Sequence, residues 1–175
     1  MRVITEKIDE ILKNKNLSRY KLSQLIDYKE STLSRIIRGE QSFSKNVKEK
    51  MLPILEVSRE EFESWIVADK YPNEVLRLAL EAKKSSLMGC QSTKILTTKL
   101  DEILQSKNLS RTALSKQIKH SQSSVNNAIT GKDPLSKKLM QKISSALEIP
   151  ENEIQSWVIA DKYPLEVLEL AVKIK

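Results

Sequence analysis

The sequence has very few of the residues on which most catalytic and metal-binding sites depend. It contains one histidine, one cysteine and three glycines. These numbers exclude zinc sites built from two cysteines and two histidines or from four cysteines, and they exclude a Cys-x-x-Cys redox pair. The glycines are too scattered for a glycine-rich phosphate loop, and no motif pairs the histidine with a nucleophile. We therefore expect no enzyme activity, no metal and no cofactor.

Long hydrophobic segments are also missing. No stretch approaches the roughly 20 apolar residues that span a bilayer, and the first ten residues carry charges in place of an apolar signal-peptide core. We expect a cytoplasmic protein with no membrane partner. The lone Cys90 is interpreted as an incidental thiol, because it stands among polar residues that resemble a linker.

What is present is a basic chain with an internal repeat. Its 175 residues include 30 Lys and Arg against 23 Asp and Glu, which gives a formal net charge of +7. Residues 4–83 align without a gap to residues 96–175, at an offset of 92, and 36 of the 80 aligned pairs are identical. We predict a first domain over residues 1–83, a linker over 84–94 and a second domain over 95–175.

Each repeat has the apolar spacing of α-helices. Ile8, Ile11 and Leu12 lie at positions i, i+3 and i+4, later segments repeat this spacing, and no strand-like alternation occurs. The expected fold is all-α, with five helices in each repeat followed by an extra sixth. Expected signals at the helix ends are N-caps at Ser18, Ser44, Ser110, Ser121 and Ser136, a poor cap at Lys29, left-handed glycines at Gly39 and Gly131, and a kink or end at Pro53.

The second and third expected helices carry a resemblance to a known family. The segment Leu22–Gly39 reads LSQLIDYKESTLSRIIRG, and Leu114–Gly131 reads LSKQIKHSQSSVNNAITG. Both resemble the helix-turn-helix of the phage repressor and Cro-type (lambda-repressor-like, XRE) family. Asp27 and Lys119 stand where that family has its turn glycine, so we expect a longer or differently shaped turn.

The resemblance implies double-stranded DNA as the partner, with the third helix of each repeat in the major groove and the first residue of the second helix on phosphate. It assigns the phosphate contact to Arg19 and Arg111. Residues assigned to the DNA-facing side of the third helices are Glu30, Ser31, Thr32, Ser34 and Arg35 in the first repeat, and Gln122, Ser123, Ser124, Asn126 and Asn127 in the second. Expected backbone contacts around the following loop are Arg38, Lys45, Lys48, Lys132, Lys137 and Lys138.

The charge distribution is consistent with that partner. Residues 13–50 have ten basic and four acidic side chains, a net of +6, whereas residues 51–84 have a net of −2. In the second repeat, residues 105–142 have a net of +7 and residues 143–175 a net of −3. A face that meets phosphates collects Lys and Arg. A solvated basic face without a partner remains the alternative.

Several other residues are interpreted as structural. Trp65 and Trp157 lie on apolar faces and are assigned to packing, while His120 lies at the turn and is interpreted as an ordinary exposed histidine. Asp69 and Asp161 are interpreted as charges that end the fifth helix before a proline turn.

These observations predict a sequence-specific transcription regulator, of the phage or plasmid repressor type. The alternatives are an accessory factor for plasmid replication or transfer, an architectural DNA-binding protein, and a protein-interaction module that retains the helix-turn-helix scaffold. One chain supplies two recognition helices, so we expect either a monomeric pseudo-dimer or a homodimer paired through the sixth helices.

Overall fold

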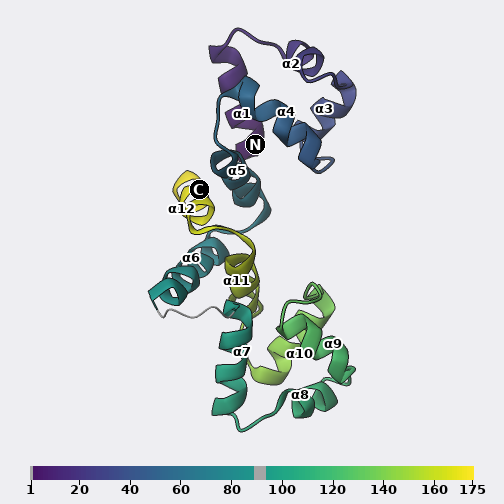
Figure 1. Cartoon of the computed structure of the whole chain (residues 1–175), viewed down its shortest axis with the longest axis vertical. Helices are drawn as coiled ribbons and strands as arrows, with labels where there is room; N and C mark the ends of the chain where they lie inside the picture. The colour runs from purple at the N-terminus through teal and green to yellow at the C-terminus, as the bar shows by residue number, and fades with distance from the viewer. Residues whose placement is uncertain (1, 89–93) are drawn as a thin grey trace. The chain divides into compact units, whose positions relative to one another are not determined.

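The structure is a computed structural model that describes residues 2–88 and 94–175. Across these two ranges the chain forms twelve α-helices and no strand, so the predicted all-α class is confirmed (Figure 1). Cys90 lies outside the described residues. No helix within the described ranges is long and apolar enough to cross a membrane.

The helices follow the order expected from the sequence. The first six are α1 (Val3–Asn14), α2 (Arg19–Leu25), α3 (Glu30–Ile37), α4 (Lys45–Leu55), α5 (Arg59–Lys70) and α6 (Asn73–Met88). The others are α7 (Ile95–Ser106), α8 (Arg111–Gln117), α9 (Gln122–Ile129), α10 (Lys137–Leu147), α11 (Glu151–Lys162) and α12 (Leu165–Ile174). Helices α1 to α5 have the same lengths as α7 to α11, whereas α6 is longer than α12.

The predicted signals at the helix ends are largely confirmed. The five predicted serine caps each accept a hydrogen bond from a backbone N–H in the first turn, and Lys29 makes no side-chain cap. Gly39 and Gly131 have φ of 77° and 65°, the left-handed region that favours glycine. Pro53 does not end its helix, because α4 continues to Leu55. Proline has no N–H to donate to the carbonyl oxygen of Glu49 four residues earlier, and the helix continues without that bond.

The first compact unit runs up to Pro72 and also includes Leu170–Lys175. Its core is formed by α1 to α5, and its largest buried side chains are Trp65 and Phe62. Ile174, at the end of α12, packs against this core, and Lys175 donates a hydrogen bond from Nζ to the carbonyl oxygen of Tyr71 at 3.0 Å. The last residues of the second repeat therefore belong to the compact unit that is otherwise formed by the first repeat.

The second compact unit comprises Asn73–Glu169. Here α6, which belongs to the first repeat, packs along α11, as Figure 1 shows. Val75, Leu76 and Ala79 of α6 are fully buried, and Lys83 donates to the carbonyl oxygen of Ala160 at 2.8 Å. Helix α6 extends to Met88, so residues 84–88 of the predicted linker are helical. The compact units therefore do not coincide with the repeats. Helix α6 of the first repeat belongs to the second unit, and the end of α12 belongs to the first unit.

Asp69 and Asp161 have a structural role that differs from the sequence interpretation. The carboxylate of Asp161 accepts hydrogen bonds from the backbone N–H groups of Ile95 and Leu96, at 2.8 and 3.0 Å. Asp69 does the same for Val3 and Ile4. Asp69 and Asp161 therefore cap the first helix of their repeats, α1 and α7, from the end of the fifth, α5 and α11. Each cap joins distant segments, unlike a charge that only ends its own helix.

Candidate nucleic-acid interface

Helices α8 and α9 form a helix-turn-helix in the second unit. Ser115 is buried where α8 crosses its neighbours, and its hydroxyl donates to the carbonyl oxygen of Thr112 at 2.8 Å. Val125 and Ile129 anchor α9 in the core, because both are almost fully buried. These apolar contacts hold one face of α9 inward and leave the opposite face at the surface.

The turn between the two helices is well defined although it lacks glycine. Lys119 takes φ of 49°, and Asp27 takes φ of 51° in the first unit. His120 N–H donates to the carbonyl oxygen of Ser115 at 2.9 Å, and the same bond joins Tyr28 to Ser23. The two turns therefore have the same geometry, and each has its left-handed residue where the family has glycine. The expectation of a differently shaped turn is wrong, because these residues adopt the left-handed conformation themselves.

Two further hydrogen bonds fix the helix-turn-helix to its unit. Lys142 of α10 donates from Nζ to the carbonyl oxygen of Ile118, which ends α8, at 3.0 Å. Thr97 of α7 donates from its hydroxyl to the carbonyl oxygen of Ile129, at the end of α9, at 2.8 Å. Lys50 and Thr5 make the equivalent bonds in the first unit. The C-terminal ends of both helices are thus held by side chains that the sequence pattern did not single out.

Arg111, at the start of α8, is held by two partners. Its Nε donates to one oxygen of Asp101 at 2.8 Å and its Nη2 to the other, while Nη1 donates to Oδ1 of Asn126 at 2.6 Å. The hydrogen bond and the charge of Asp101 raise the pKa of Arg111, against the effect of partial burial. The guanidinium is therefore always charged, oriented, and connected to the surface of α9.

The other α9 residues that are predicted to face the DNA differ in whether their side chains have hydrogen-bond partners. Gln122 and Ser123 are exposed, and among the described residues neither side chain has a hydrogen-bond partner. The Ser124 hydroxyl instead accepts a hydrogen bond from the hydroxyl of Ser121 at 2.8 Å. Asn127 is half-buried and donates from Nδ2 to Asp133 at 3.0 Å.

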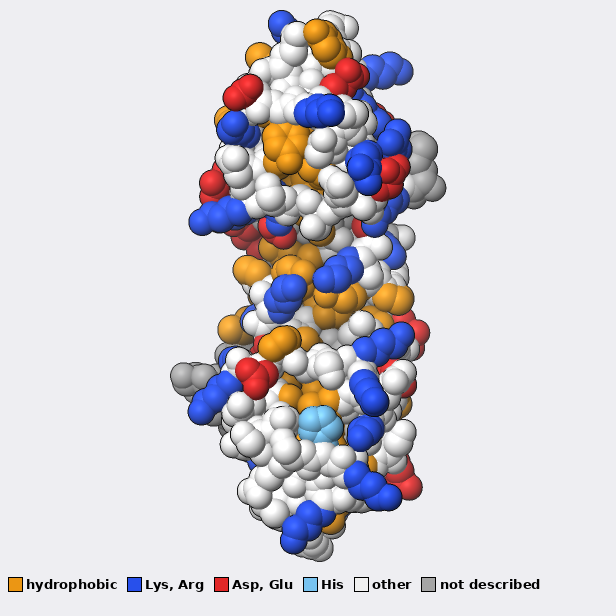
Figure 2. Space-filling model, turned by 90° about the vertical axis from the view of Figure 1, so that its right-hand side faces the viewer, with side chains coloured by type: hydrophobic (Ala, Val, Ile, Leu, Met, Phe, Trp, Pro, Cys, Tyr) orange, Lys and Arg blue, Asp and Glu red, His pale blue; other side chains and the backbone are white. Residues whose placement is uncertain are grey.

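The loop after α9 and the start of α10 carry free positive charge. Lys132, Lys137 and Lys138 are exposed, and none forms an ion pair with any residue that the structure describes. His120 is exposed at the turn as expected, and Figure 2 shows it as the pale-blue side chain, with Lys and Arg side chains near it in the lower part of the view. An array of unpaired lysines beside an exposed polar helix surface is suited to phosphate groups.

The first unit repeats the fold of this surface but not its electrostatics. Arg19 is bound by Asp9 through two hydrogen bonds of 2.8 and 2.6 Å, as Arg111 is by Asp101. Arg35 and Arg38, predicted to contact DNA, both bind Glu40, at 3.3 and 2.8 Å. The other predicted residues of α3 are at the surface: Glu30 and Ser31 are exposed, and Thr32 and Ser34 are half-buried.

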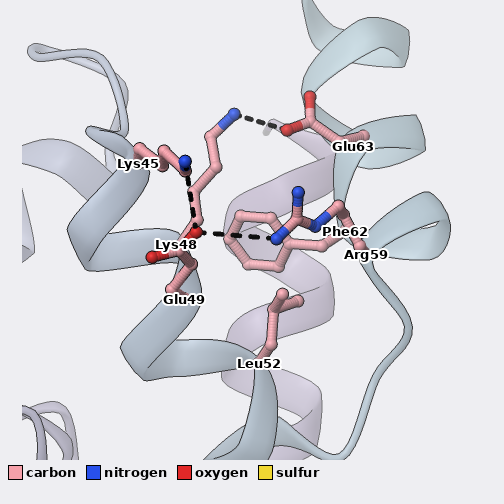
Figure 3. A pocket seen from close by; sticks show the side chains of 7 residues that line it. All are labelled: Lys45, Lys48, Glu49, Leu52, Arg59, Phe62 and Glu63. Carbon is pink, nitrogen blue, oxygen red and sulfur yellow. Dashed lines mark hydrogen bonds and ion pairs between the residues drawn. The ribbon is translucent and has the colours of Figure 1, made fainter.

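The predicted backbone contacts on α4 are also engaged in ion pairs. Lys48 binds Glu63 of α5 at 2.6 Å, and Lys45 lies 3.9 Å from Glu49, which also faces Arg59 at 3.6 Å (Figure 3). These side chains surround a pocket of about 170 Å³ whose apolar wall is formed by Leu52 and Phe62. The first unit therefore offers fewer free cations than its net charge indicates.

A comparison with known families is consistent with this geometry. Residues 100–154 match the family model described as helix-turn-helix. The matched segment contains all of α8, α9 and α10, and hence the Arg111 network and the free lysines. No curated protein and no solved structure matches the chain.

Proposed function

We propose that the chain is a sequence-specific regulator of transcription, of the repressor type, that binds double-stranded DNA through α9 and works in the cytoplasm. One observation carries the proposal: the exposed side chains at the start of α9, the oriented guanidinium of Arg111 and three lysines without ion-pair partners among the described residues all belong to one helix-turn-helix and the segment that follows it. Helix-turn-helix domains place such a helix in the major groove, with phosphates on its flanks. The match over residues 100–154 supports the same class of function.

The first repeat is proposed to act as a second, weaker reader in a monomeric pseudo-dimer. Its equal helix lengths, its left-handed residues at the same offset and the Asp9–Arg19 pair support a tandem duplication. The buried face of α6 contacts α11 of the same chain, which favours pairing of the repeats over pairing of chains. The ion pairs around Glu40 favour an alternative in which the first repeat is a partner-binding module.

Selection of bound duplexes from a random library, followed by footprinting, tests the proposal. We expect a defined sequence and an affinity that falls between about 50 and 200 mM salt, with a log–log slope of about −0.9 for each phosphate contacted. Two protected segments about one helical turn apart for each chain indicate two readers. One segment per chain indicates that only one repeat reads DNA.

Charge variants identify the surface that binds. Replacing Lys132, Lys137 and Lys138 by glutamine should reduce the slope by up to about 2.7, because up to three phosphate contacts are lost. Lys45→Gln combined with Lys48→Gln is the matched control, and we expect a smaller change because these lysines already have acidic partners. Affinity that does not depend on salt contradicts the proposal.

A further inference from the structure

Each compact unit has a cleft at the same repeat positions. In the second unit the cleft lies where the start of α7, the end of α9 with the loop that follows it, and the end of α11 meet, and its volume is about 370 Å³. The equivalent cleft of the first unit has a volume of about 380 Å³, and all but one of its lining positions are shared with the second. Both volumes lie within the range of roughly 300–1,000 Å³ that is usual for sites of small molecules.

The cleft of the second unit has an apolar floor. Leu96 of α7 and Ala128 of α9 are almost fully buried, and Leu135 and Val158 beside them are half-buried. An apolar group placed on this floor would remove water from the two half-buried side chains, which is favourable. The floor is therefore suited to the hydrocarbon or aromatic body of a ligand.

Three lysines surround this floor, and in the described part of the chain none of them has an ion-pair partner. Lys132 and Lys162 are exposed, and Nζ of Lys162 lies 5.3 Å from the ring centre of Tyr163. Nζ of Lys94 donates to the carbonyl oxygen of Gly131 at 2.9 Å. It lies only 2.3 Å from the point that a Cβ of Gly131 would occupy, so the glycine makes room for this ammonium group.

Two aspartates also line the cleft, but both already have hydrogen-bond donors. The carboxylate of Asp161 accepts from the backbone N–H groups of Ile95 and Leu96. Asp133 accepts from the amide of Asn127. The lysines outnumber the aspartates, and the aspartates are engaged elsewhere. A negatively charged group is therefore the ligand group that this cleft favours.

The first unit keeps the shape of the cleft but not its free cations. Glu40 replaces Lys132, and the other two cations with acidic partners are Arg2 and Lys48. Among the described residues, only Lys70 is left there as a cation without an ion pair. The first cleft is therefore a matched control with the same size and a different charge.

We propose that the cleft of the second unit binds a small organic anion, with an acidic head group on an apolar body, and that this ligand competes with DNA for Lys132. The body lies on the apolar floor and the head group pairs with the lysines around it. Lys132 is also proposed to contact phosphate, and an ammonium group paired with the ligand is less available to a duplex. The competition rests on the proposed DNA-binding function, whereas the ligand site does not.

An NMR titration of the full chain tests the site without DNA. The probes are 2-naphthoate and 2-naphthyl phosphate, and 2-naphthylmethanol is the neutral control of similar shape. We expect both anions to shift the backbone amides at the cleft, namely Gly131, Lys132, Leu135 and Val158. The alcohol should bind up to about fivefold more weakly, because it lacks the charge that pairs with lysine.

Charge variants separate the two clefts. Lys162→Gln should weaken binding of both anions by up to about fivefold, and its matched control in the first unit, Lys70→Gln, should leave it unchanged. Lys132→Glu introduces the residue of the first repeat and should weaken binding by a larger factor. These side chains are exposed, so the variants should keep the wild-type fold, which circular dichroism checks.

The competition is measured as the ratio of the duplex Kd with and without saturating 2-naphthoate, so that each variant's own DNA affinity cancels. The duplex is the one selected from the random library. We expect a ratio of up to about five in the wild type and in Lys70→Gln, and a ratio near one in Lys132→Glu. A wild-type ratio of one overturns the competition.

The outcomes distinguish this inference from the function proposed above. If the chain selects no duplex, the proposed function fails, and the NMR titration alone decides the ligand site. The site is overturned if the anions shift only amides outside the cleft, if the alcohol binds as tightly as the anions, or if Lys70→Gln weakens binding as much as Lys162→Gln. Shifts at the cleft that require both the negative charge and Lys162 support it.

Discussion

Asp161, at the end of α11, caps α7. Its replacement should destabilise the fold more than replacement of most other polar residues. In the second unit, Asp161→Ala removes the acceptor for two backbone N–H groups, which the carboxylate binds at 2.8 and 3.0 Å. It also removes a negative charge from the N-terminus of α7. Both changes destabilise the folded state, because the N–H groups at this end have no partner within the helix.

The expected loss can be worked out from these contacts. Loss of an N-cap acceptor costs about 1 kcal/mol, and loss of the favourable charge at a helix N-terminus costs about 0.3–1 kcal/mol more. We expect Asp161→Ala to lower the free energy of unfolding by about 1.3–2 kcal/mol. Asp161→Asn keeps an acceptor but not the charge, so its loss should be about a quarter to a half as large.

Native-state hydrogen exchange of the full chain measures this change unit by unit. Protection of the Leu100 and Leu104 amides should fall in Asp161→Ala, whereas the equivalent amides of Ile8 and Leu12 report on the first unit. Asp69→Ala is the matched control, and it should lower protection in α1 first. Wild-type protection of α7 in Asp161→Ala would refute the reasoning, and so would a loss as large in Asp161→Asn as in the alanine variant.

Three other substitutions test local features, each by the midpoint of urea unfolding. Lys29→Ser should stabilise the chain by about 1 kcal/mol because α3 then gains the N-cap that Ser121 supplies to α9, and an unchanged midpoint would contradict this. Gly131→Ala should destabilise it by about 1 kcal/mol, since φ of 65° strains a residue with a Cβ, which would also displace the Lys94 side chain. Lys142→Met should cost about 1 kcal/mol because the carbonyl oxygen of Ile118 loses its donor while the aliphatic packing is kept; a neutral effect would show that water replaces the lysine.

The features that sequence reasoning predicted correctly are local ones. A serine cap such as Ser121 acts within one helical turn, and Gly131 reports on its own backbone angle, so each can be read from a few neighbouring residues. Apolar spacing gave the helix order for the same reason. The turn at Lys119 shows the limit of this approach, because a missing glycine predicts a changed turn only if the replacing residue avoids the left-handed region.

The features that the sequence did not predict depend on contacts between distant segments. Asp161 bonds residues 65 and 66 positions away, and nothing in the local pattern distinguishes this cap from a charge that ends its own helix. The packing of α6 on α11 joins residues of different repeats, whereas periodicity indicates only that α6 has an apolar face. One signal was available: Asp9 and Asp101 are identical and each stands ten residues before an arginine, but no sequence rule pairs them.

The candidate DNA-binding residues show why net charge is a poor guide to which surface binds. The two basic segments differ by only one charge, +6 and +7, yet their cations are arranged differently. Glu40 forms ion pairs with both Arg35 and Arg38, while the residue at the same repeat position in the second unit is the exposed Lys132. Phosphates attract unpaired cations, whereas an exposed arginine–glutamate pair costs up to about 1 kcal/mol to exchange for a phosphate contact. The acidic residue in one repeat and the basic residue in the other thus distinguish the two surfaces more than their net charges do, and this difference supports the proposal that the second repeat is the stronger reader.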